Sequence, residues 1–216
     1  MDIEFARQQM VGQQVRAWDV LHPDVLKVLR SVPREQFVPG GYEPLAFADT
    51  EIPIGHEQKM MTPTLEGRVL QALKPGSSDK VLEIGTGSGF LTACLARLAH
   101  SVTSVDIHEE FLATATVNLE DSGITNFSLL PMDATLELPE GTYDAIAVTG
   151  SIEEFDPRFV LALNQGGRLF VVVGNAPAMD ARVITRTGDS DWQSISLFET
   201  ELMPLVNGSK PPQFLF

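Results

Sequence analysis

The hydrophobic pattern changes at residue 80, where short apolar runs begin to alternate with longer segments of helical periodicity. The runs that predict strands lie at 80–84, 101–107, 126–131, 143–150 and 168–174. The segments that predict helices lie at 89–99, 109–123 and 156–164, with a turn at Gly166-Gly167 before the last strand. Such alternation indicates a parallel sheet with helices on both faces. Residues 181–199 alternate around Gly188-Asp189 and predict an antiparallel hairpin at the sheet's edge. We therefore expect an α/β fold with a doubly wound, mostly parallel sheet.

The first part of the chain follows a different pattern. Residues 5–18 and 22–32 predict helices, and Pro23 suits the first turn of the second. Residues 30–56 are rich in proline and glycine and predict irregular chain that packs on the main body. Thr62 is expected to cap a helix that begins at Pro63. We divide the chain into an N-terminal helical and irregular appendage, 1–62, and a main domain, 63–216.

Composition is that of an ordinary globular protein, with 44% hydrophobic and 20% charged residues. The 15 basic and 29 acidic residues give a formal net charge of −14. Because this charge repels a phosphate backbone, we expect no nucleic-acid partner. The protein is also expected to be a monomer.

Cys94 is the single cysteine, which excludes a disulfide framework within one chain and fits a reducing compartment. It lies among apolar residues, so we expect a buried thiol. The start, MDIEFARQQM, lacks the pattern of a signal peptide, and the apolar run 169–173 is too short to span a bilayer. We expect a cytoplasmic protein with no membrane partner.

The stretch VLEIGTGSGF, residues 81–90, places a glycine loop between a predicted strand and a predicted helix. Such a loop lets backbone approach a ligand closely, although it can also be a purely structural turn. A dinucleotide fingerprint would need glycine where Phe90 stands, and no Walker motif occurs. Glu83, two residues before Gly85, would repel a pyrophosphate but suits a ligand that carries an amino-acid moiety and a sulfonium.

Two further acids end neighbouring predicted strands. Asp106 lies 21 residues past Gly85, where a carboxylate can accept hydrogen bonds from ribose hydroxyls. Asp133 follows the third strand, in position to meet an adenine amino group. With these acids, the loop resembles the main motif of class I S-adenosylmethionine-dependent methyltransferases. That resemblance implies S-adenosyl-L-methionine as cofactor, S-adenosyl-L-homocysteine as product, and a cofactor site that comprises Glu83, Gly85, Thr86, Gly87, Ser88, Gly89, Asp106, Asp133 and Thr149.

A closer resemblance rests on landmarks along nearly the whole chain. These are VPREQFVP at 32–39, ADTEIPIGHEQKMMTP at 48–63, the glycine loop, YDAIAVTGS at 143–151 and MPLV at 203–206. Together they resemble the protein-L-isoaspartate O-methyltransferase family. The resemblance implies an enzyme that methylates isoaspartyl carboxylates of damaged proteins, after which the ester collapses to a succinimide and hydrolysis restores some normal aspartate. It implies no nucleic-acid substrate, and no histidine spacing suggests a metal site.

The segment after the Pro-Ile-Gly turn departs from the family pattern Gly-Gln-Thr-Ile-Ser-Gln-Pro. Lys59 stands in place of threonine, Met61 in place of the serine that contacts the substrate, and Thr62 in place of glutamine. A thioether cannot donate a hydrogen bond. Lys59 could pair with the acceptor carboxylate, and Thr62 could supply a hydroxyl, so these three residues are the candidate catalytic group. Lys59 could also be a solvated surface charge, and the methionines could serve packing alone.

Two alternatives to isoaspartyl transfer stay open at this point. A paralogue could keep the cofactor site and use another acceptor, or the chain could bind the cofactor and have lost methyl transfer. The terminal segment SKPPQFLF, 209–216, either packs on the body or docks a partner.

Overall fold

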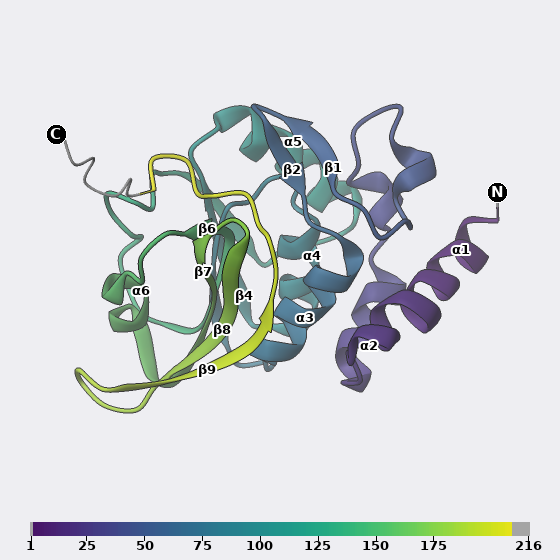
Figure 1. Cartoon of the computed structure of the whole chain (residues 1–216). Helices are drawn as coiled ribbons and strands as arrows, with labels where there is room; N and C mark the ends of the chain where they lie inside the picture. Colours follow the sequence, from purple (N-terminus) through teal and green to yellow (C-terminus); the bar gives the residue numbers. More distant parts are fainter. Residues whose placement is uncertain (1, 209–216) are drawn as a thin grey trace, which may run out of the picture.

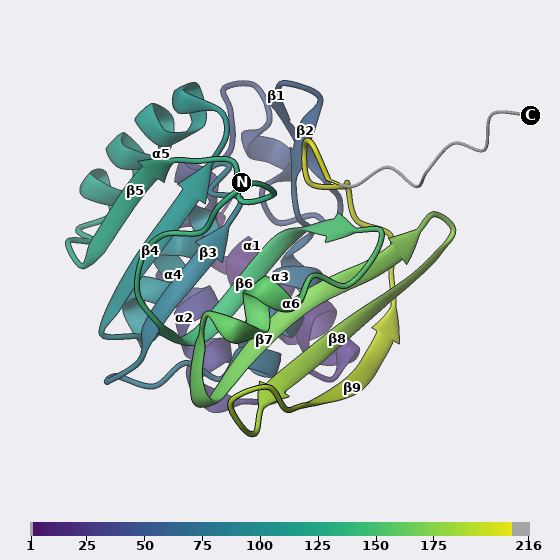
Figure 2. The same ribbon diagram turned by 90° about the vertical axis from the view of Figure 1, so that its left-hand side faces the viewer.

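A computed structural model describes residues 2–208, and its centre is a single seven-stranded sheet (Figure 1). The strands are β3 (Lys80–Ile84), β4 (Ser101–Asp106), β5 (Phe127–Pro131), β6 (Tyr143–Ile152), β7 (Leu163–Asn175), β8 (Ala178–Arg186) and β9 (Trp192–Glu199). Their order is β5-β4-β3-β6-β7-β8-β9 (Figure 2). The first five are parallel, and β8 and β9 are antiparallel to their neighbours. The predicted sheet and its C-terminal hairpin are confirmed.

Helices cover the sheet unequally. The helices α3 (Pro63–Leu73), α4 (Phe90–Leu98) and α5 (Glu109–Asp121) lie on one face, and the short α6 (Pro157–Leu161) lies on the other (Figures 1 and 2). Two hydrophobic clusters fill the space between sheet and helices. The first includes Leu70, Phe90 and Ala115, and the second includes Ile146 of β6 and Phe159 of α6. The buried Cys94 belongs to the first cluster, as its apolar surroundings predict.

The N-terminal segment packs outside α3 and α4 (Figure 1). Its helices are α1 (Ile3–Gln9), η1 (Met10–Val15), η2 (Arg16–Trp18), α2 (Pro23–Ser31), η3 (Arg34–Gln36) and η4 (Glu43–Leu45). The single helix predicted over 5–18 is therefore a succession of α, π and 3-10 turns. Close packing has a local cause, because a Cβ on Gly67 of α3 would lie 2.9 Å from Val15.

Residues 52–60 form a small hairpin that the prediction of irregular chain missed. Its strands are β1 (Ile52–Gly55) and β2 (Gln58–Met60), paired antiparallel. The turn between them has positive φ at three consecutive residues: Gly55 (103°), His56 (48°) and Glu57 (58°). Strands of three and four residues carry too little periodicity to be recognised along the chain.

The helix predicted over 156–164 is longer than the helix in the structure. The turn predicted at Gly166-Gly167 is also wrong, because both glycines lie within a strand. The helix α6 ends at Leu161, and β7 already begins at Leu163. Between the pairs Tyr143↔Leu163 and Ala145↔Arg168 the register shifts, so the two glycines lie in a bulge of the strand. Gly166 has φ of 79°, which glycine adopts without strain.

No helix among residues 2–208 is long and apolar enough to cross a membrane. The terminal segment 209–216, for which packing and docking were both considered, lies outside the described residues.

Candidate active site

A cavity opens at the carboxyl ends of the parallel strands, between the neighbouring strands β3 and β6. The strand that follows β3 lies on one side of this pair, and the strand that follows β6 lies on the other. Ligands of doubly wound sheets bind at such a switch point. Its lining includes the glycine loop after β3, the β1–β2 hairpin, the segments that follow β4 and β5, and residues 202–206 near the end of the described chain. The structure brings the predicted site residues to this place, and all of them line the cavity except Gly89 and Thr62.

The backbone of the glycine loop adopts a conformation in which residues other than glycine would be strained. Gly85, Gly87 and Gly89 have φ values of 97°, 51° and 84°. A Cβ on Gly85 would lie 2.1 Å from the hydroxyl oxygen of Thr149, which contacts the carbonyl oxygens of Ile84 at 2.8 Å and Gly85 at 2.9 Å. Thr149, in the second half of β6, therefore holds the start of the loop against the sheet.

Glu83 is fully buried beside the loop and lines the cavity. Its Oε2 accepts hydrogen bonds from the hydroxyls of Ser104, at 2.6 Å, and Thr92. Its Oε1 has no hydrogen-bond partner among the described residues. Burial raises the pKa of Glu83 to about 8, although the two hydroxyls oppose the shift. Burial thus favours the neutral form of the carboxyl group, and a cation bound beside it would favour the charged form.

Thr86 and Ser88 serve the loop's own structure. The hydroxyl of Thr86 lies 2.7 Å from that of Ser104 and donates to it, because Ser104 donates its own proton to Glu83. The Ser88 hydroxyl accepts from the backbone N–H of Phe90 at 3.4 Å, and its carbonyl accepts from Asn118 at 3.0 Å. Both residues line the cavity.

Two carboxylates stand at the ends of β4 and β5, as predicted. Asp106 accepts hydrogen bonds from the backbone N–H groups of Gly87 and His108, each at 3.0 Å, one on each oxygen. Asp133 accepts from the backbone and hydroxyl of Thr135, at 2.9 and 2.6 Å. Burial raises the pKa of Asp133, but hydrogen bonds from Thr135 and Asn207 outweigh it and lower the pKa overall. A carboxylate can accept about four hydrogen bonds, so both retain capacity for a ligand.

The hairpin brings the altered loop to the opposite side of the cavity. Met60 and Met61 are buried and line it, and Lys59 stands at its rim. The ammonium group of Lys59 lies 2.8 Å from a carboxylate oxygen of Glu51, and this pairing raises the pKa of Lys59. Lys59 is therefore ion-paired with Glu51. The sequence-based hypotheses, a pairing with the acceptor or a solvated surface charge, did not include this pair.

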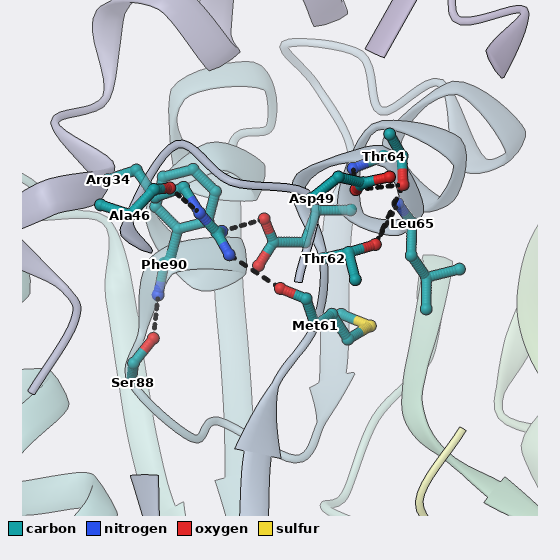
Figure 3. A network of polar contacts seen from close by, with 10 residues as sticks. Arg34, Ala46, Asp49, Met61, Thr62, Thr64, Leu65, Ser88 and Phe90 are labelled. Atoms are coloured by element: carbon teal, nitrogen blue, oxygen red, sulfur yellow. Dashed lines mark hydrogen bonds and ion pairs between the residues drawn. The ribbon is translucent and has the colours of Figure 1, made fainter. Parts of the chain in front are cut away.

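Beneath Met61 lies a buried network around Arg34 that sequence reasoning missed (Figure 3). Arg34 is fully buried and donates to the carbonyl oxygens of Met61, at 2.7 Å, and Ala46, at 2.8 Å, as well as to Glu66. Its guanidinium carbon lies 4.8 Å from the ring centre of Phe90. Burial raises the pKa of Glu66 to about 7, although Arg34 opposes the shift. The network ties the backbone of the altered loop to the helix after the glycine loop.

Thr62 begins α3, as predicted. Its hydroxyl accepts from the backbone N–H of Leu65 at 3.3 Å and lies 3.0 Å from the hydroxyl of Thr64 (Figure 3). An N-cap bond of this kind stabilises the first turn of a helix. The Thr62 hydroxyl is thus engaged in capping α3. Its role as a hydroxyl donor to the acceptor stays a prediction.

The β1–β2 hairpin reaches across the mouth of the cavity. A Cβ on Gly87 would lie 3.1 Å from Ile54, so this side chain touches the glycine loop. At the tip, the imidazole of His56 stacks on that of His108 with ring centres 4.1 Å apart, and Phe111 packs edge-on against both. The hairpin is thus seated on the residues that follow Asp106.

The segment 202–207 crosses the other side. The backbone N–H of Ser151 donates to Met203 at 2.8 Å, and that of Leu205 donates to Ser151 at 2.9 Å. The Asn207 amide donates to Asp133 at 2.9 Å. This segment contains the MPLV landmark, whose position in the cavity wall the sequence did not reveal. Within residues 2–208, no group of three or more His, Cys, Asp or Glu side chains is arranged to hold a metal ion.

Comparison with known proteins places this cavity in a family. The model of the protein-L-isoaspartate(D-aspartate) O-methyltransferase family matches residues 6–210. The chain belongs to this family. A protein-L-isoaspartate O-methyltransferase 2 of Pelobacter propionicus is 37% identical over 205 residues, which cover 94% of this chain and 91% of the relative. A protein-L-isoaspartate O-methyltransferase of Koribacter versatilis is 33% identical over 201 residues, covering 93% and 90%.

A solved structure supports the fold of this isoaspartyl methyltransferase family member. A protein-L-isoaspartate O-methyltransferase of Plasmodium falciparum, described as putative and in complex with S-adenosyl-L-homocysteine, superposes with a TM-score of 0.79 at 18% identity. The match covers 92% of this chain and 97% of the Plasmodium chain. This likeness supports the fold, and membership of the protein-L-isoaspartate O-methyltransferase family makes the chain a class I methyltransferase, an enzyme whose cofactor is S-adenosylmethionine.

The cavity suits that cofactor. The Oε1 of buried Glu83, which has no hydrogen-bond partner among residues 2–208, offers an acceptor to a cationic ligand group. The glycine loop leaves room that a Cβ would fill, and Asp106 stands beside it with spare acceptor capacity. Which of these residues touch the cofactor remains the prediction made from the sequence.

Proposed function

We propose that this protein transfers the methyl group of S-adenosylmethionine to the isoaspartyl carboxylate of damaged proteins, despite its altered loop. One observation carries the proposal: the cavity joins the glycine loop and its acids to the segment 58–61, which in this family meets the acceptor. Lys59, the only lysine or arginine among the described residues that line it, stands on the acceptor side. A carboxylate acceptor needs such a cation, since the carboxylates of Asp106 and Asp133 also line the cavity.

The division of labour follows the two parts of the chain. We assign cofactor binding to the domain 63–216, through Glu83, the loop with Thr86 and Ser88, Asp106, Asp133 and Thr149. We assign the acceptor side to the appendage 1–62, through Lys59, Met61 and Thr62. The hairpin carries Lys59 and ends directly before Met61, and it is fixed on the cofactor side by Ile54 and by the stacked His56 and His108. Acceptor and donor sides are thereby held in a fixed relation.

Little catalytic machinery is required for this reaction. S-adenosylmethionine, when bound, supplies a methyl group on a sulfonium, which is a good electrophile. An isoaspartyl carboxylate is ionised at neutral pH, so the chain needs no general base. Its residues must orient the carboxylate and exclude water from it, which is catalysis by proximity and desolvation. Lys59 supplies the charge that orients the carboxylate, and the buried Met60 and Met61 exclude water beside it.

The protein is further proposed to act as a monomer in the cytoplasm, on polypeptides and on neither nucleic acid nor membrane. The formal charge of −14 supports the exclusion of nucleic acid, and the single cysteine fits a reducing compartment. Light scattering during gel filtration tests the first point, because a dimer would double the measured mass.

The test is methyl transfer from labelled S-adenosylmethionine to a matched pair of peptides, one isoaspartyl and one normal aspartyl, with cofactor affinity measured by calorimetry. We expect label on the isoaspartyl peptide alone. Cofactor binding without label would favour a paralogue with another acceptor or a protein that has lost transfer. Absence of cofactor binding would refute the assignment of the glycine loop.

A further inference from the structure

The rim of the cavity carries the ion pair between Lys59 and Glu51, and Glu51 has no role in the function proposed above. Glu51 precedes β1 and Lys59 lies in β2, so the pair bridges the base of the hairpin. Their charged atoms lie 2.8 Å apart, and both residues line the cavity. The side chains keep 35% (Glu51) and 43% (Lys59) of their exposure, which leaves the pair open to an entering ligand.

Charge makes this pair decisive for an anionic acceptor. The described lining of the cavity includes the acids Glu51, Glu66, Glu83, Asp106 and Asp133, and Lys59 is its one lysine or arginine. Arg34 lies beneath the lining and is fully buried in bonds to Glu66 and to carbonyl oxygens. A carboxylate that enters therefore has one ammonium group to approach, and Glu51 already occupies it.

We propose that Glu51 is a specificity-determining residue of the acceptor site, because its carboxylate holds the place on Lys59 that an acceptor carboxylate takes. The inference rests on the proposed function, since it presumes an anionic acceptor. An isoaspartyl carboxylate replaces one ion pair by another and loses little in the exchange. An acceptor without a carboxylate leaves the Glu51–Lys59 pair in place and gains nothing from Lys59. The pair thus closes the rim to neutral acceptors.

Exchange is feasible because exposed ion pairs are weak, contributing up to about 1 kcal/mol, or roughly a fivefold change in an equilibrium constant. Removal of the Glu51 charge is expected to lower KM for an isoaspartyl peptide about twofold to fivefold. The effect on kcat is expected to be smaller, because the competition weakens acceptor binding in the ground state and the transition state alike.

The test compares Glu51→Gln with Glu57→Gln in the full chain. Glu57 lies at the tip of the same hairpin, is exposed, does not line the cavity and makes no hydrogen bond or ion pair within residues 2–208. Both variants change the net charge by one, so a general electrostatic effect appears in both. We expect the fall in KM in Glu51→Gln alone. In a Lys59→Met background, Glu51→Gln is expected to leave KM unchanged, as a double-mutant cycle requires of a coupled pair.

The outcomes separate this inference from the proposed function. Equal KM values in Glu51→Gln and Glu57→Gln, or a higher KM in Glu51→Gln, would overturn the role of Glu51. The proposed function would still hold if the wild type methylates the isoaspartyl peptide. If wild type binds cofactor but methylates no isoaspartyl peptide, both fall together. Melting temperatures of all variants show whether a change in KM reflects altered folding.

Discussion

Replacement of Met61 by serine is expected to raise the efficiency of isoaspartyl methylation. Met61 stands where the family has a serine that contacts the acceptor, and its buried side chain lines the cavity. Its thioether cannot donate to a carboxylate, whereas a serine hydroxyl can. The backbone would stay in place, because the carbonyl of residue 61 accepts from buried Arg34 whatever the side chain is.

The size of the gain follows from the bond that serine would restore. A hydrogen bond to a charged group contributes about 1.5–3 kcal/mol, which corresponds to roughly a 10- to 150-fold rise in kcat/KM. The same change removes buried apolar atoms from a side chain only 7% exposed. Truncation of a buried methionine costs about 2–5 kcal/mol of unfolding free energy, and the lower end applies here because the void opens onto the cavity.

The assay is kcat/KM for an isoaspartyl peptide at saturating cofactor, with unfolding free energy measured by urea denaturation. The matched control is Met60→Ser, since Met60 is also buried and lines the same cavity. We expect a gain in Met61→Ser and none in Met60→Ser. No gain in Met61→Ser at retained stability, or an equal gain in both variants, would refute the reasoning that the hydroxyl of residue 61 is the missing contact.

Four further predictions concern the cavity and its support. Asp106→Asn should weaken cofactor binding about 10- to 150-fold by calorimetry, since a charged acceptor is lost; an unchanged affinity would contradict its role. Arg34→Met should cost about 3–5 kcal/mol in urea denaturation, because Glu66 is left buried without a cation, and Arg34→Met/Glu66→Gln should recover part of it; equal loss in both would contradict this. The apo protein should melt at a higher temperature near pH 5 than near pH 9. The pKa is raised to about 7 for Glu66 and about 8 for Glu83, so each contributes stability that is fully present below the unfolded pKa near 4.5 and is lost as pH rises through 7 and 8. Glu83→Gln should therefore flatten the dependence of melting temperature on pH. Lys59→Met should raise KM for the isoaspartyl peptide with unaltered cofactor affinity, and an unchanged KM would show that Lys59 does not orient the acceptor.

The parallel sheet was predictable because its signals are local. The runs 80–84 and 101–107 are short, apolar and flanked by helical periodicity. The structure has strands there, β3 with the predicted bounds and β4 ending one residue earlier, at Asp106. The glycine loop was equally legible, since positive φ at Gly85 and Gly89 is what glycine permits at low cost. Acids at strand ends could be expected to converge because the carboxyl ends of parallel strands meet at one edge.

The acceptor side could not be predicted in the same way, because its contacts join distant residues. Arg34 and Glu66 are charged types that are mostly exposed, and nothing in the pattern indicates that they pair in the core. Pairing of Glu51 with Lys59 depends on the β1–β2 hairpin, which local periodicity did not reveal. The short α6 and the early start of β7 reflect a bulge whose register only the folded sheet determines.

The most direct test of isoaspartyl transfer follows the acceptor itself by mass spectrometry. Purified protein and S-adenosylmethionine are incubated with an isoaspartyl peptide, and intact mass and chromatographic form are recorded over time. We predict the mass increase of one methyl ester, its loss through a succinimide, and the appearance of the normal aspartyl peptide. An unchanged isoaspartyl peptide in the presence of bound cofactor would contradict the proposed function.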